Sequence, residues 1–433
     1  MTEILIEARL LWFADEPDAE CEMPSQVRYI EHGVLAIGAD GMIAWCGDRS
    51  ELPEHYRCWP AVDHRRNLVM PGFIDTHIHF PQAQVVASYA GSLLEWLNRY
   101  TFVEEQRFGD DVHAERIAAA FFDQLIAHGT TTASAYCSVH RQSAEAFFAE
   151  AERRNLRMAG GKVMMDRGAP AALTDTAQSG YDDTKALISK WHGCGRLSYA
   201  ISPRFALTST EAQLEASGAL VAEHRECLVQ THIDENHGEI AEAARLFPWA
   251  RDYLDIYERY GLLGLSMLLG HCVHLKDREL RRIAETGSVA VFCPTSNLFL
   301  GSGLYDLARL SGAGARSAIA TDIGGGTSWS MLRTMDEGYK VLNLQGQRWR
   351  PFRSFYLSTL GNARALGMER RIGSLDAGFE ADLVVLDACA TPAMALRMET
   401  VERLEEELFL LQTLGDDRAV AQVYVMGAAS KRL

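Results

Sequence analysis

Short β-branched runs alternate with helical patterns eight times between residues 67 and 371, and this alternation constrains the fold more than any other feature of the chain. The first run ends in VMPGFIDTHIH and the last in SAIATDIGGG. Stretches between the runs, such as HAERIAAAFFDQLIAHG, carry apolar residues at helical spacing and end near glycine. Eight strand–helix units are what a (β/α)8 barrel of the TIM type needs, and such barrels place their active sites at the carboxyl ends of the strands.

Polar side chains stand at the predicted ends of most of these runs. They are His77 and His79, Arg204, His232, His271, Asn297 and Asp322. A doubly wound open sheet is the alternative α/β fold, but it would gather its ligand at a single switch point. Polar residues at the ends of several successive strands therefore favour the closed barrel.

The two ends of the chain have a different pattern. Residues 1–66 contain GVLAIGADGMIAWCGD, which predicts two short strands around an Asp-Gly turn. Residues 372–433 contain AGFEADLVVLDA and AQVYVMGAA, which also predict strands. Neither flank is large enough to bury a core of its own. We therefore expect a small β-sandwich domain built from both chain ends, beside a catalytic barrel of residues 67–371.

Charge and composition limit the partners of the chain. The net charge of −16 argues against a nucleic-acid partner, because such proteins carry basic patches. No apolar run approaches the roughly 20 residues that span a bilayer. The N-terminal stretch MTEILIEARLLWFADEPDAE has acidic residues where a secretory signal would be basic. The nine cysteines are odd in number and form no CxxC pair, which is typical of reduced thiols. These features predict a cytoplasmic protein that acts on a small molecule.

His77 and His79 lie one residue apart at the end of the first barrel strand. Residues i and i+2 of a strand face the same side, so the two imidazoles point into one space, which suits a shared metal. Two histidines at a strand end can also be unrelated. A metal site therefore requires further ligands from other strands.

Three later strand ends offer such ligands. His232 lies in THIDEN, with Glu235 three residues behind it. The segment GHCVHL contains His271 and His274, and position at the strand end favours His271 as the site residue. Asp322 in ATDIGGGTS ends an apolar strand, at a depth where a charged residue is rarely unpaired. Neutral imidazoles and one carboxylate suit zinc or ferrous iron and leave room for a water that ionises near neutral pH. The pattern predicts a metal-dependent hydrolase.

The order HxH, His, His, Asp on barrel strands resembles the amidohydrolase superfamily and, within it, the mononuclear purine and pyrimidine deaminases. The resemblance is most specific to the guanine deaminase family and covers essentially the whole chain. The segments that carry it are PGFIDTHIHFPQ, LLEWLNRYTFVEE, GKVMMDR, SPRFALTS, THIDEN, HCVHL, FCPTSNLFLGSG, TDIGGGTS and TLGDDRAVAQVYVMG.

The resemblance implies a catalytic centre. The residues that match the family's metal ligands are His77, His79, His232 and Asp322. Glu235 matches the proton shuttle, His271 the residue that hydrogen-bonds the attacking water, and Asp322 also serves as base. Binuclear relatives bridge two metals with a modified lysine on the fourth strand, but LSYAISPRFA has none and Lys162 lies on the third. One divalent metal per subunit is therefore expected, zinc first and ferrous iron as the alternative.

The resemblance also implies the substrate. Guanine would be deaminated at C2 to xanthine and ammonia in purine catabolism, by a homodimer. Gln82 and Arg204 match the family's base-reading residues, and their donors and acceptors suit a purine edge. Phe205, Trp96 and Leu97 would cover the base, although core packing explains Trp96 equally well. His232 and Glu235 would also contact the substrate.

Two other functions stay open at this point. A related amidohydrolase could use the same metal site on another purine, a pterin or a triazine, and only the region of Gln82 and Arg204 would differ. A non-catalytic barrel that acts by assembly is the second alternative, but such a protein would be expected to have lost metal ligands. The glycines at 324–326 match no phosphate-binding motif and predict close backbone approach instead.

Overall fold

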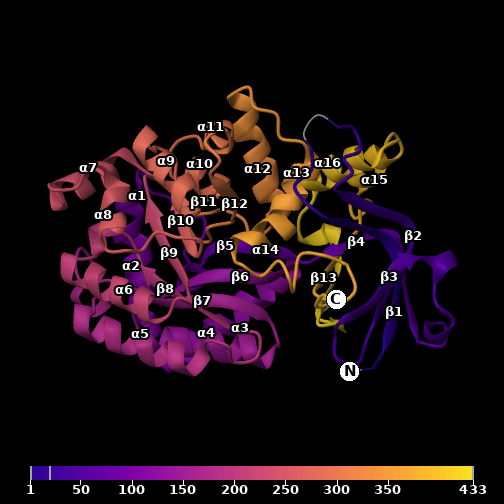
Figure 1. Cartoon of the computed structure of the whole chain (residues 1–433), viewed down its shortest axis with the longest axis horizontal. Helices are drawn as coiled ribbons and strands as arrows, with labels where there is room; N and C mark the ends of the chain where they lie inside the picture. The colour runs from indigo at the N-terminus through magenta and orange to yellow at the C-terminus, as the bar shows by residue number, and fades with distance from the viewer. Residues whose placement is uncertain (1, 19–20, 432–433) are drawn as a thin grey trace.

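The structure, a computed structural model, describes residues 2–18 and 21–431. Its two sheets lie side by side, with the parallel one wrapped in helices (Figure 1). The eight strands of the parallel sheet are β5 (Phe73–His79), β6 (Thr130–Cys137), β7 (Arg157–Met164), β8 (Ser198–Pro203), β9 (Leu228–Ile233), β10 (Met267–His271), β11 (Val289–Phe292) and β12 (Arg316–Ile319). They follow one another in chain order, which confirms the predicted barrel.

The barrel strands are buried on both faces. Every residue of β6 and β7 is buried, as expected where helices cover the outside and side chains fill the inside. The larger outer helices are α3 (Asp111–Ala127), α4 (Arg141–Arg153), α5 (Ala177–Trp191), α6 (Glu211–Glu223), α7 (His237–Leu246), α8 (Tyr253–Arg259), α9 (Asp277–Thr286) and α12 (Met331–Leu344). Shorter helices α10 (Pro294–Phe299), α11 (Leu307–Gly312), α13 (Pro351–Tyr356) and α14 (Asn362–Ala365) complete the wall.

Side chains join the first barrel strand to the last. The Asn362 amide nitrogen donates to the carbonyl oxygens of Ile74 on β5 and Ile319 on β12, at 2.7 Å each. The buried carboxylate of Asp75 accepts a 3.1 Å hydrogen bond from the amide of Thr321 and a second bond from its hydroxyl. These contacts close the barrel at a seam between β5 and the segment after β12.

A helical insertion follows β5 before the chain reaches the next barrel strand. It consists of α1 (Leu93–Trp96), a π-helical turn η4 (Leu97–Thr101) and α2 (Phe102–Glu105). Ser92 caps the first turn, because its hydroxyl accepts from the Glu95 amide. The insertion buries Trp96, Leu97, Phe102 and Glu105. A carboxylate among these apolar groups requires a charged or polar partner.

The second sheet combines both ends of the chain, as predicted. Its strands are β1 (Ile4–Phe13), β2 (Val27–Ile37), β3 (Ile43–Asp48), β4 (Ala61–Pro71), β13 (Leu383–Leu386), β14 (Val420–Val425) and β15 (Ala428–Ala429), in the order β15-β14-β13-β4-β1-β2-β3. Figure 1 shows the indigo strands of the N-terminal end beside the yellow C-terminal segments. One face carries its own core, which includes Ile6, Leu35 and Val385. Helices α15 (Pro392–Met398) and α16 (Leu404–Leu414) belong to the same end of the molecule.

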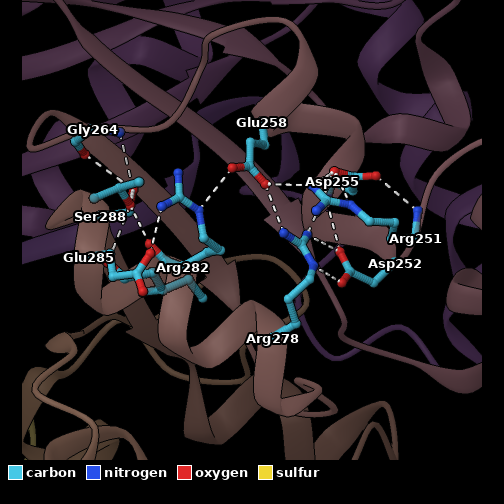
Figure 2. Close-up of polar contacts among 11 residues, drawn as sticks. Arg251, Asp252, Asp255, Glu258, Gly264, Arg278, Arg282, Glu285 and Ser288 are labelled. Carbon is cyan, nitrogen blue, oxygen red and sulfur yellow. Dashed lines mark hydrogen bonds and ion pairs between the residues drawn. The ribbon is translucent and has the colours of Figure 1, made fainter.

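Charged side chains join α8 to α9 on the outside of the barrel (Figure 2). Arg278 binds both carboxylate oxygens of Asp252 and donates a 2.8 Å hydrogen bond to Glu258. Arg282 donates to the other oxygen of Glu258, also at 2.8 Å. Asp252 additionally caps α8 by accepting from the Asp255 amide at 2.9 Å. The network links these two short helices through charged side chains.

None of the helices in the described part of the chain has both the length and the apolar composition of a membrane span.

Candidate active site

Three imidazoles and a carboxylate meet at the carboxyl end of the barrel. The atoms that His77, His79, His232 and Asp322 offer all lie within 4.8 Å of one another. Nε2 of His232 lies 3.2 Å from Nε2 of His77 and 3.1 Å from Nε2 of His79. Oδ1 of Asp322 lies 3.4 Å and 3.3 Å from the same two nitrogens. Ligands about 2.0 Å from a tetrahedral zinc are separated by about 3.3 Å, so the spacing matches a cation site.

The surroundings keep these histidines neutral. Burial lowers the pKa of His79 to about 4 and lowers the pKa of His77 as well. Burial and the neighbouring imidazoles hold the pKa of His232 well below its ordinary value. Nδ1–H of His232 donates to the backbone carbonyl of Arg204 at 2.7 Å, which leaves a lone pair on Nε2. Neutral imidazoles with lone pairs directed at one point are the form that binds metal.

Asp322 lies three residues beyond the end of β12, so the expectation that it ends the strand itself is wrong. The backbone here turns toward β5, and the Asp322 amide donates to the His77 carbonyl at 2.9 Å. This turn brings the carboxylate beside both histidines of β5. Burial opposes ionisation, but hydrogen bonds from His77 and His79 outweigh it and hold the pKa of Asp322 well below its ordinary value.

Two glycines permit the close packing around these ligands. A Cβ atom on Gly270 would lie 2.5 Å from Cε1 of His77, so the position before His271 admits no side chain. A Cβ on Gly326 would lie 1.8 Å from the carbonyl oxygen of Thr321. The glycine run was predicted to allow close backbone approach, and Gly326 lies in such close contact with the backbone of Thr321.

Glu235 and His271 lie next to the four ligands. Oε2 of Glu235 is 3.4 Å from Nε2 of His271, and Oε1 accepts a 2.8 Å hydrogen bond from the hydroxyl of Ser302. Nδ1 of His271 lies 2.9 Å from Oδ1 of Asn297, to which it donates. Burial and the charge of Asp322 raise the pKa of Glu235 to about 8. A carboxyl group that holds its proton near neutral pH can deliver that proton to a substrate.

The predicted base-reading residues face each other across a buried carboxylate. Nη1 of Arg204 donates to Oε1 and Oε2 of Glu105, at 2.9 and 2.8 Å. The amide nitrogen of Gln82 donates to Oε1 of the same group at 2.9 Å. All three side chains are buried. Arg204 is thus part of a buried network and not of a surface ion pair.

A cavity with about 390 Å³ of empty space opens between these groups. Its lining includes every residue that the sequence assigned to substrate binding, together with most of the predicted catalytic and metal-binding groups. The lining residues are His79, Gln82, Leu93, Trp96, Leu97, Arg204, Phe205, His232, Glu235, His271, Leu300, Asp322 and Gly325. His77 lies deeper, fully buried behind His232.

Sequence reasoning missed four contributors to the site. Glu105 and Ser302 hold functional side chains through hydrogen bonds, while Leu93 and Leu300 line the cavity. Asn297 was singled out without a role, and its bond to His271 supplies one. The block LLEWLNRYTFVEE contains three glutamates, and no signal in the sequence singles out Glu105 among them.

Lys162 is remote from this chemistry. Its ammonium group is buried and pairs with Asp175 at 2.6 Å. His274 lies in the loop after β10, where its Nε2 contacts the carbonyl oxygen of Ser302 at 2.7 Å.

Known proteins of similar sequence and structure place the chain in a family. The profile of the Amidohydrolase family matches residues 68–429. Guanine deaminase of Escherichia coli K12 is 45% identical over 417 residues, which cover 95% of this chain and 93% of that protein. A guanine deaminase structure from Bradyrhizobium japonicum is 34% identical with a TM-score of 0.94, over 99% of each chain. A structure of guanine deaminase from C. acetobutylicum with bound guanine is 26% identical with a TM-score of 0.88, also over 99% of each chain. The chain therefore belongs to the amidohydrolase family and, within it, to the guanine deaminases.

Proposed function

We propose that this protein hydrolyses guanine at C2 to give xanthine and ammonia, with one divalent metal in the His77, His79, His232 and Asp322 group. The observation that carries the proposal is the junction of that group with the Gln82 and Arg204 network in one cavity. The first half of the site suits water activation and the second suits recognition of a purine edge. Relatives that are named guanine deaminase, and that align with nearly the whole chain, support the same reaction.

The donor set fits a metal. Three imidazole nitrogens converge at 3.1–3.2 Å with a carboxylate oxygen beside them, and without a cation their lone pairs would repel. Nδ1 of His77 and His79 are buried and have no hydrogen-bond partner among the described residues. Three histidines and one aspartate suit zinc, which is our proposal, with ferrous iron as the alternative. When bound, the cation lowers the pKa of a water molecule so that hydroxide forms near neutral pH.

Protein side chains carry the proton transfers. Asp322 accepts a proton from the attacking water, and His271 hydrogen-bonds that water. Glu235, protonated in its buried position, gives its proton to N3 of guanine as the C2–O bond forms. The Glu235 carboxylate then takes up the proton of the new C2 hydroxyl group and delivers it to the amino nitrogen. The C2–N bond breaks, ammonia leaves, and the proton held by Asp322 returns to Glu235. Two acids in different protonation states can divide these tasks.

The other half of the cavity binds the base. Gln82 and Arg204 supply donors and an acceptor to its polar edges, while Phe205, Trp96 and Leu97 cover its faces. Hydrogen-bonding sites of this kind discriminate strongly, because a wrong ligand leaves buried polar groups unpaired.

Ammonia release from a panel of guanine, adenine, a pterin and a triazine tests the proposal. Protein purified without added metal should contain about one zinc or iron per chain and should act far faster on guanine than on the other three. Comparable or greater turnover of a pterin or triazine would instead identify the related amidohydrolase activity. No turnover of any compound by metal-loaded protein would favour a non-catalytic barrel.

We further propose that the protein is a cytoplasmic homodimer of purine catabolism. The nine cysteines are all unpaired, which suits a reducing compartment. The proposed dimer rests on the family resemblance. Analytical ultracentrifugation of the purified protein would determine its mass by sedimentation. A single species near the 48.1 kDa of one chain would contradict the dimer.

A further inference from the structure

We infer that Glu105 is a positioning residue that sets the substrate selectivity of the site by orienting both Gln82 and Arg204. This inference rests on the proposed deamination of guanine and adds a determinant that does not itself touch the base. Glu105 lies on α2 behind the cavity and is not among its lining residues. It is 1% exposed, so its charge is compensated entirely by groups inside the protein.

Glu105 determines which way the Gln82 amide points. A carboxylate only accepts hydrogen bonds, so the Gln82 atom 2.9 Å from Oε1 must be the amide nitrogen. On its other side, the Gln82 oxygen accepts from the backbone amide of Gly324 at 3.2 Å. The two contacts have opposite polarity and exclude the flipped amide. One N–H of Gln82 is left for the substrate in a fixed direction.

Glu105 also determines which edge of Arg204 is free. Both oxygens of the carboxylate bind Nη1, at 2.9 and 2.8 Å. Within residues 2–18 and 21–431, Nε and Nη2 of Arg204 form no hydrogen bond. Because the guanidinium is rigid and planar, fixing Nη1 fixes the direction of these remaining donors. They are the groups available to an oxygen or nitrogen acceptor on the base.

The insertion after β5 holds Glu105 in place. Phe102, one helical turn earlier on α2, lies under the Arg204 guanidinium, with its ring centroid 5.5 Å from Cζ. The hydroxyl of Ser138 at the end of β6 donates to the Glu105 backbone carbonyl at 2.9 Å. The same helix therefore supplies an aromatic face and a carboxylate to one arginine, and the barrel anchors the helix.

The charge balance of the pair matches a neutral ligand with an oxo group. Glu105 neutralises Arg204 inside the protein, so the cavity presents directed N–H donors without an uncompensated positive charge. An uncharged base carrying an acceptor such as the 6-oxo group satisfies those donors. A base without that acceptor leaves them buried and unpaired, which is the costly case. Glu105 thus compensates the charge of Arg204, so that the remaining donors of the arginine favour a neutral base with a carbonyl acceptor.

The test compares Glu105→Gln with wild type on guanine and on 2-aminopurine, which lacks the 6-oxo group. For 2-aminopurine, turnover is measured, or the inhibition constant against guanine if turnover is absent. The glutamine has the same shape, but its NH2 group faces a donor and its charge is lost. We expect kcat/KM for guanine to fall about 10- to 100-fold, because a hydrogen bond to a charged group is lost. The preference for guanine over 2-aminopurine should fall by about 10-fold.

A double-variant cycle separates positioning from general damage. If Glu105 acts through Arg204, then E105Q should change kcat/KM much less in an R204A background than in wild type. Glu105→Asp keeps the charge but is too short to reach both partners, and its preference for guanine should lie between wild type and E105Q. If E105Q does not fold, the same measurements on Glu105→Asp test the inference.

Glu407→Gln is the matched control. Glu407 is a buried carboxylate that binds Arg9 through two hydrogen bonds of 2.7 and 2.6 Å, far from the cavity in sequence and structure. It should lower the melting temperature without altering the preference between the two bases. An unchanged preference in both Glu105 variants, or additive effects of E105Q and R204A, would overturn the inference. Failure of the proposed function is a separate result, namely a wild-type protein that releases no ammonia from guanine.

Discussion

The backbone carbonyl of Arg204 accepts a 2.7 Å hydrogen bond from Nδ1 of His232, and this contact joins the two halves of the site. The side chain of Arg204 lines the cavity, while its main chain fixes the tautomer of His232, a proposed metal ligand. The proposed recognition and metal-binding functions are thus coupled through one residue that directly follows β8.

Arg204→Ala should separate the two roles. The substitution keeps the backbone carbonyl, so we expect metal content to stay near the wild-type value. It removes the donors that face the base, so kcat/KM for guanine should fall by about 100-fold or more. Metal analysis and steady-state kinetics on the same preparation measure both. A variant that retained full activity and selectivity would contradict the assignment of Arg204.

His77→Ala should abolish metal binding. The imidazole is fully buried among the other ligands, and its loss leaves three donors around an open position. We expect metal content measured by atomic emission to drop several-fold, with loss of turnover. His55→Ala, at an exposed histidine of the N-terminal region, should change neither quantity.

Glu235→Gln should stop the chemistry and spare the metal. Glu235 is not one of the four grouped ligands, and glutamine can still accept the hydrogen bond from Ser302. Loss of a general acid typically lowers the rate by about 10²- to 10⁴-fold, and kcat should fall within this range. Equal metal content and an unchanged melting temperature would show that the protein is intact. Substantial residual turnover would reassign the proton shuttle.

The contribution of Glu239 to the stability of the protein should decrease as pH rises from about 5 to 7. Burial and the charge of Glu235 raise the pKa of Glu239 from 4.5 to about 7, so the folded state holds a proton that the unfolded state has released. A raised carboxyl pKa stabilises the fold at low pH, and this contribution is lost as pH passes through 7. Each such proton changes the free energy of unfolding by about 1.4 kcal/mol per pH unit.

Glu239→Gln should flatten that dependence. The variant cannot ionise, so the slope of unfolding free energy against pH between 5 and 7 should be smaller, as measured by urea denaturation at constant metal content. Glu242→Gln on the same helix is the control. Glu242 pairs with Arg245 at 2.6 Å near the surface, and its pKa is lowered, so it stays ionised over this pH range in both states. An identical slope in wild type and Glu239→Gln would refute the prediction.

Arg278→Ala should destabilise the protein more than Arg282→Ala. The Asp252 side chain is only 3% exposed, and loss of Arg278 leaves its charge buried without its main partner (Figure 2). We expect a cost of about 3 kcal/mol in unfolding free energy. Arg282 is more exposed and Glu258 keeps a second arginine, so its removal should cost about 1 kcal/mol or less. Thermal or chemical denaturation would rank the two variants.

The barrel and its ligand order were predictable because both depend on local patterns. Alternating strand and helix periods define the units, and histidines at strand ends such as His77 and His232 must point toward the same end of a barrel. Asp322 lies in one group with His77, His79 and His232, but it does not lie on the predicted element. Its position depends on the seam contacts with β5, which no local pattern reveals.

Glu105 was not predictable as a network member for a different reason. Its partners Gln82 and Arg204 are 23 and 99 residues away, and acids on short helices are usually solvated. The sequence of α2 carries two adjacent glutamates, and nothing local distinguishes the buried Glu105 from the neighbouring Glu104. Burial of a charge is decided by tertiary partners, which only the folded structure identifies.

The barrel seam has a consequence for biosynthesis. His77 and His79 leave the ribosome early, but Asp322 emerges some 240 residues later and Asn362, which ties the two strand ends together, later still. A nascent chain released before Asp322 is synthesised contains the histidines but lacks the carboxylate that completes the group of four. The complete donor set therefore forms only late in synthesis, and a truncated product without Asp322 would lack one of the four grouped side chains.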